Sequence, residues 1–129
     1  MTYYHSKILK NTSFDEAIEK VTESLKQEEF GILTEIDIRE TMKKKLGENF
    51  RPYKILGACN PPFAFQALKA EDKIGTMLPC NVIVQEVEEG IEIAAVDPIV
   101  SMQGIKNKAL ENIANQVQSK LFEAIDATE

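Results

Sequence analysis

The sequence predicts a single α+β domain, in which a five-stranded, largely antiparallel sheet is backed by helices. Apolar residues recur every three or four positions in residues 14–25 and 105–125, and this is the period of amphipathic helices. Runs rich in β-branched and aromatic residues lie between these segments and are typical of strands. The runs at 82–87 and 91–96 are separated only by Glu88-Glu89-Gly90, which indicates a hairpin and therefore antiparallel pairing.

The length and composition of the chain limit the classes of function that we expect for it. The chain has 129 residues, enough for one domain over 1–129, with 43% apolar and 28% charged residues, as in ordinary globular proteins. Its net charge of −6 disfavours nucleic acid as a partner, because phosphate binding needs a basic surface. The apolar runs are far shorter than the roughly 20 residues of a membrane span. We therefore expect a soluble, cytoplasmic protein that binds neither nucleic acid nor membrane, with two free thiols in a reducing compartment.

The first half of the chain predicts a strand at residues 3–10, a helix, a second strand and a short helix. Asn11-Thr12-Ser13 offers a helix cap, with Asp15 or Glu16 completing a capping box. The second strand covers residues 30–36, and plain alternation would put Phe30, Ile32 and Ile36 on one face. Asp37 is expected to cap the short helix and Gly47 to end it.

The second half predicts a third strand at 53–59, a helix opened by Asn60-Pro61, the hairpin, and a last helix at 105–125. Asn60 is read as the helix cap and Pro61 as its first residue. Residues 72–79 are expected to form a loop, and Asp97-Pro98 to stop the last strand. The full order is strand, helix, strand, short helix, strand, helix, strand, strand, helix.

One dipeptide, Cys-Asn, occurs twice, as Cys59-Asn60 and Cys80-Asn81. Each copy lies where an expected strand ends or begins, so both thiols should meet at one end of the sheet, roughly 5–10 Å apart. We refer to these four residues as the twin Cys-Asn motif. It is the predicted site, although each cysteine could equally be a small buried apolar residue.

Three stretches resemble the family described as domain of unknown function 302. They are Phe30 to Asp37, then Phe50 to Tyr53 with Ile55 to Pro62, and finally Leu78 to Val82. The Gly-Ala-Cys-Asn-Pro and Leu-Pro-Cys-Asn signatures carry the resemblance most specifically. The resemblance implies a fold like that of the TATA-binding protein, with a curved antiparallel sheet backed by helices, and a homodimer. It implies no activity and no DNA binding.

The main hypothesis is a homodimeric module that binds a small ligand or a soft metal at the twin Cys-Asn motif. Cys59 and Cys80 would be the metal ligands, since sulfur selects copper(I) or zinc, and Asn60, Asn81 or Asp97 could complete the site. Further candidate ligand-binding residues are Glu35 on a strand, Asp97 at a strand end and Arg51 before Pro52.

Two alternatives remain open. In the first, the protein is a thiol-dependent enzyme or redox protein with Cys59 as nucleophile, because Cys59 precedes a helix N-terminus, where thiolates are stabilised. His5 is the only histidine available to such a thiol, and it is more typical of a satisfied surface residue. In the second, the chain is a structural interaction domain with packing cysteines.

Overall fold

The computed structural model describes residues 2–129, and it confirms the predicted α+β architecture. Five antiparallel strands form one sheet in the order β1-β5-β4-β3-β2. The strands are β1 (Tyr4–Leu9), β2 (Gly31–Asp37), β3 (Tyr53–Cys59), β4 (Cys80–Val87) and β5 (Gly90–Val96). The helices are α1 (Phe14–Gln27), α2 (Ile38–Leu46), α3 (Pro61–Ala70), α4 (Pro98–Ser101) and α5 (Lys108–Ala127), with a 3₁₀ helix, η1 (Asp72–Met77), after α3.

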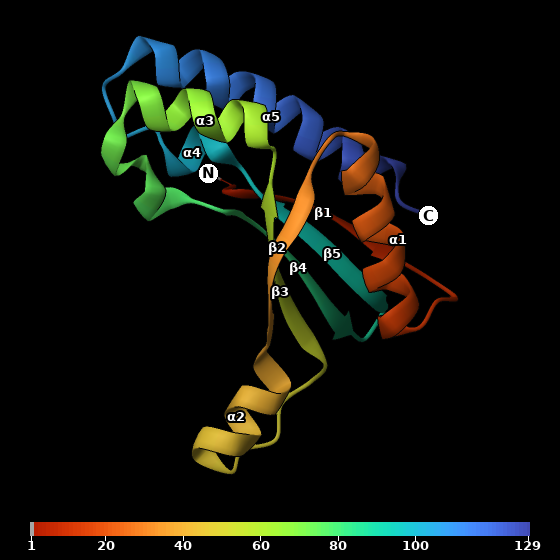
Figure 1. The fold of residues 1–129 in the computed structure, drawn as a ribbon. Helices are drawn as coiled ribbons and strands as arrows, with labels where there is room; N and C mark the ends of the chain where they lie inside the picture. The colour runs from red at the N-terminus through yellow and green to blue at the C-terminus, as the bar shows by residue number, and fades with distance from the viewer. Residues whose placement is uncertain (1) are drawn as a thin grey trace.

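Helices α1, α3 and α5 lie on one side of the sheet (Figure 1). The core between the layers forms because alternate strand residues point toward these helices, among them Leu56, Val82 and Ile93. From the helical side, α5 contributes Val117 and Leu121, as its four-residue spacing predicts. Within residues 2–129, no helix lies against the opposite face of the sheet, so the helices of this range cover one side only (Figure 1).

Local signals fix the helix ends largely as predicted. Ser13 Oγ accepts from the Glu16 backbone N–H while Glu16 reaches back to the Ser13 N–H, so the capping box opens α1. Asp37 accepts from the Glu40 N–H at the start of α2. Gly47 ends α2 with a φ of 68°, the left-handed conformation that glycine adopts without strain.

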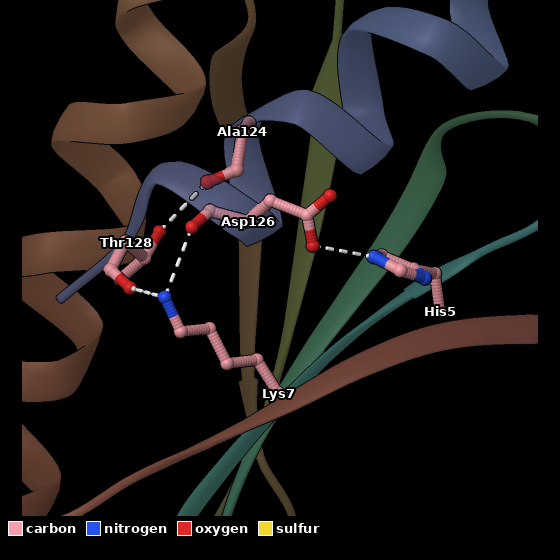
Figure 2. A network of polar contacts seen from close by, with 5 residues as sticks. All are labelled: His5, Lys7, Ala124, Asp126 and Thr128. Atoms are coloured by element: carbon pink, nitrogen blue, oxygen red, sulfur yellow. Dashed lines mark hydrogen bonds and ion pairs between the residues drawn. The ribbon is translucent and has the colours of Figure 1, made fainter.

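The end of α5 is fastened to β1 by side chains of β1 (Figure 2). Lys7 Nζ donates to the backbone oxygens of Asp126 at 2.9 Å and Thr128 at 2.5 Å, which places a cation at the helix C-terminus. His5 Nε2 lies 2.7 Å from the Asp126 carboxylate, and its ring stacks on Phe122. The only histidine is therefore a structural residue here.

Three local expectations were wrong. A bulge at Leu33 reverses the alternation of β2, so Ile32 pairs with Ala58 on the helix side while Ile36 pairs with Ile55 on the uncovered side. The last helix begins at Lys108 and not at 105, because the Asn107 side chain caps it.

The third correction concerns the connections around the site. Asp97 caps α4, with Pro98 as its first residue, so this pair begins a short helix as well as ending β5. Residues 72–77 of the expected loop form η1.

Candidate functional site

The two cysteines of the twin Cys-Asn motif lie at one end of the sheet, as predicted. Cys59 is the last residue of β3 and Cys80 the first of the neighbouring β4. Ala58 lies directly opposite Cys80 in the antiparallel register, so Cys59 is one residue beyond that pair. Both cysteines are free.

Both cysteines are among the residues that line an apolar pocket of about 320 Å³. Its walls come from the β3 and β4 ends, α3, η1, α4 and α5, with Phe63, Met102 and Val117 among the lining side chains. Leu33 and Leu68 also line it while remaining 66% and 43% exposed, so they mark its mouth. The eighteen lining residues that the structure describes include no charged side chain, and Asn60 supplies their single amide.

The surroundings keep both thiols protonated. Burial raises the pKa of Cys59. Burial, together with the smaller effect of repulsion from a Cys59 thiolate, raises the pKa of Cys80 to about 11. Cys80 is 7% exposed and belongs to the hydrophobic core. Each thiol is thus held in its neutral form.

The start of α3 explains why Cys59 gains no stabilising charge there. A helix N-terminus favours anions because its first N–H groups are free. Pro61 and Pro62 occupy the first two positions and have no N–H, while the Ala64 N–H is used by the Asn60 carbonyl. The Phe63 N–H alone remains, so the site offers little to a thiolate or to a bound anion.

The expectation that the Asn60 side chain caps α3 was wrong. It occupies the cap position of α3, but its side chain makes no cap hydrogen bond. Instead Asn60 Nδ2 donates to the backbone oxygen of Glu28 at 3.2 Å, and the residue is 4% exposed. The amide ties the β3–α3 junction to the end of α1, because two prolines leave it few helix donors to cap.

The remaining predicted site residues lie away from the pocket. Asn81 points to the opposite face of the sheet, where it lines a second hollow. Glu35 pairs with Lys54 at 3.4 Å, and Arg51 stacks over the Phe50 ring. Asp97 accepts from two backbone N–H groups of α4 and from Gln118, so capping uses its oxygens.

No group of three or more histidine, cysteine, aspartate or glutamate residues within 2–129 is arranged to hold a metal ion. The two thiols would therefore have to bind a soft metal without a third such ligand from this part of the chain. Likewise, no helix in the described range is long and apolar enough to cross a membrane.

Sequence reasoning missed most of the pocket wall. No sequence pattern pointed to Met102 as a pocket residue. Ile113 and Val117 belong to the apolar stripe of the last helix, which is explained by packing on the sheet alone. A stripe of apolar residues predicts burial but does not distinguish a filled interface from a cavity. The pocket becomes visible only when the ends of β3 and β4 are seen together with α3, η1, α4 and α5, which all contribute to its wall.

The fold and the site define a small two-layer α+β domain with a thiol-bearing apolar pocket at one sheet end. The family described as domain of unknown function DUF302 matches residues 5–128, and the chain belongs to that family. Among solved structures, the chain is similar to an uncharacterized conserved protein DUF302 from Bacillus stearothermophilus, with 29% identity, a TM-score of 0.92 and full coverage of both chains. No curated protein matches it.

Proposed function

We propose that the protein is a binding module for a small, uncharged, apolar molecule held in the pocket beside Cys59 and Cys80. The observation that carries this proposal is the wall itself, whose described residues include no charged side chain. Its volume of about 320 Å³ is at the lower end of the ~300–1,000 Å³ typical of small-molecule sites. The mouth between Leu33 and Leu68 gives such a molecule a way in.

The chemistry of the site favours a neutral ligand. A charged group would lose its hydration in the pocket, and this costs several kcal/mol when no partner replaces the water. Helix α3 begins with two prolines and therefore offers a ligand only one free backbone N–H. Asn60 offers one side-chain amide. The thiols add polarisable, weakly polar contact, which suits aromatic rings or other soft groups.

The raised pKa values of both thiols argue against Cys59 as an activated nucleophile, since reactive cysteines have lowered pKa values. Binding of a soft metal by Cys59 and Cys80 stays a prediction, which Cys59→Ser with Cys80→Ser would test through copper(I) uptake. Two free cysteines suit a reducing compartment such as the cytoplasm.

The direct test uses a matched pair of fluorescent probes. N-phenyl-1-naphthylamine is uncharged, and 1-anilinonaphthalene-8-sulfonate is nearly the same molecule with an added sulfonate. We expect the neutral probe to bind at least tenfold more tightly. Bound probe should also slow the reaction of N-ethylmaleimide with Cys59, which is half-buried at the pocket wall.

A pair of variants locates the probe. Ala64→Trp puts a large side chain into the pocket wall and should abolish binding. Ala109→Trp adds the same group at an exposed position of α5 outside the pocket and should leave binding unchanged. Equal binding of the two probes, or unchanged binding to Ala64→Trp, would reject the proposal.

A further inference from the structure

A second hollow lies on the face of the sheet that α1, α3 and α5 leave uncovered (Figure 1). Its volume is about 380 Å³, which falls within the ~300–1,000 Å³ of small-molecule sites. Tyr3, Tyr4 and Tyr53 all line it, and they are the three tyrosines of the chain. The pairing of distant strands brings these rings to one place. We call this site the tyrosine hollow.

One end of the tyrosine hollow is polar. Tyr53, Gln85 and Glu92 are successive partners across β3, β4 and β5, so their side chains point to the same face. Gln85 Nε2 donates to Glu92 Oε1 at 2.7 Å. Because a carboxylate only accepts hydrogen bonds, the amide must turn its NH₂ group to Glu92. The Gln85 carbonyl oxygen and the second Glu92 oxygen form no hydrogen bond within residues 2–129, so both can accept from a ligand.

The hollow is elongated along the strands. Tyr4 pairs with Val96, which follows Glu92 by four residues in β5, so the two ends are roughly 13 Å apart at about 3.3 Å per residue. Ala94 lies between them, opposite Ile83 in β4, and the two side chains make an apolar floor. A ligand that fits this shape has a polar head and an apolar body.

The charge at the polar end favours a cation. Glu92 takes part in no ion pair within the described residues 2–129. Arg51, which precedes β3, stacks over the Phe50 ring at 4.4 Å and does not pair with it. Residues 86–92 contain four glutamates and no basic residue. A positive group beside Glu92 would therefore be attracted, whereas an anion would be repelled.

We propose that the tyrosine hollow binds a small organic cation, a guanidinium group on a short aliphatic chain. The planar head donates its several N–H groups to Glu92 and to the Gln85 carbonyl oxygen, and it stacks on the Tyr53 ring. The chain lies over Ala94 and extends toward Tyr4. This site is distinct from the pocket beside the cysteines, whose described wall includes no charged side chain and which lies on the other side of the sheet.

The test is an NMR titration of ¹⁵N-labelled protein with two matched compounds. n-Butylguanidinium and n-butylurea have nearly the same shape, and only the first carries a charge. We expect the Kd of the cation to be at least tenfold lower, with the largest shifts at the side-chain amides of Gln85 and Asn81, which also lines the hollow. Methylguanidinium lacks the chain and should bind at least threefold more weakly than n-butylguanidinium.

Three variants locate the binding energy. Glu92→Gln keeps the shape but removes the charge, so it should raise the Kd of n-butylguanidinium at least tenfold and leave n-butylurea unchanged. Glu123→Gln makes the same change at an exposed position of α5 and should alter neither Kd. Tyr53→Leu removes a ring of the hollow and should weaken binding of the cation at least threefold.

Several results would overturn the proposal. They are equal Kd values for n-butylguanidinium and n-butylurea, no saturation by the cation up to 50 mM, and an unchanged Kd in a folded Glu92→Gln variant. Shifts confined to Glu86, Glu88 and Glu89 would also overturn it, because they would show attraction to exposed glutamates outside the hollow.

Discussion

Alkaline pH should destabilise the fold through Cys80, and the effect can be estimated from its surroundings. The pKa of this thiol is about 11 in the folded chain, against 9.0 for an unperturbed thiol. The unfolded chain therefore releases its proton first as pH rises. The stability that comes from keeping the thiol neutral is present below pH 9 and is lost as pH approaches 11. At pH 10.5 the loss is about 2 kcal/mol, because each unit of pKa difference is worth about 1.4 kcal/mol.

The assay is urea unfolding at pH 8.0 and pH 10.5, for the native chain and for Cys80→Ala. Lysines and tyrosines also ionise in this range, so the informative quantity is the difference between the two proteins. The alanine variant should be less stable at pH 8.0 and should lose about 2 kcal/mol less than the native chain on moving to pH 10.5. Equal losses would show that the Cys80 environment does not oppose its ionisation, and the description of its surroundings as buried and apolar would then be wrong.

Three other substitutions test the packing. Leu121→Ala removes a fully buried side chain of α5 and should cost about 2–5 kcal/mol in urea unfolding; a loss of a few tenths would make α5 peripheral to the fold. Gly57→Ala puts a methyl group against Thr34 Oγ1 and 2.7 Å from Pro79 Cγ, and should lower the free energy of unfolding by roughly 1–3 kcal/mol. Gly104→Ala is the control, because its methyl group meets open space. Lys7→Met keeps the aliphatic stem but removes both hydrogen bonds to the α5 end, and should lower the free energy of unfolding by about 1 kcal/mol; no change would mean that this contact adds nothing.

Much of the fold is readable from the sequence because its signals are local. The capping box at Ser13, the Asp37 cap and Gly47 each act within one helical turn, and they fixed their helix ends as predicted. The hairpin signal established antiparallel pairing of the last two strands. The sequence suggested that Cys59 and Cys80 could converge, and they do because β3 and β4 are antiparallel neighbours, so that the end of β3 lies beside the start of β4.

Local signals failed where a competing contact decided the outcome. The bulge at Leu33 reversed the faces of β2, and no residue pattern marks such an insertion in advance. Asn60 looked like a helix cap, but a carbonyl of α1, 32 residues away in sequence, took its amide instead. Asp97 does not contribute to the pocket, because its carboxylate caps α4. Asn81 does not contribute either, because the alternation of β4 places it on the opposite face of the sheet.

The sequence by itself determined the α+β class, the strand pairing near the hairpin and the position of each cysteine at a strand end, because periodicity, turn and capping signals act over a few residues. Only the tertiary structure decided what surrounds those thiols. The pocket is lined by α3, η1, α4, α5 and the ends of β3 and β4, so it depends on how elements from different parts of the chain pack together. The same holds for the uncovered sheet face, because α1, α3 and α5 all lie on the other side of the sheet. Volume, exposure and pKa are properties of that arrangement, which short-range patterns do not encode.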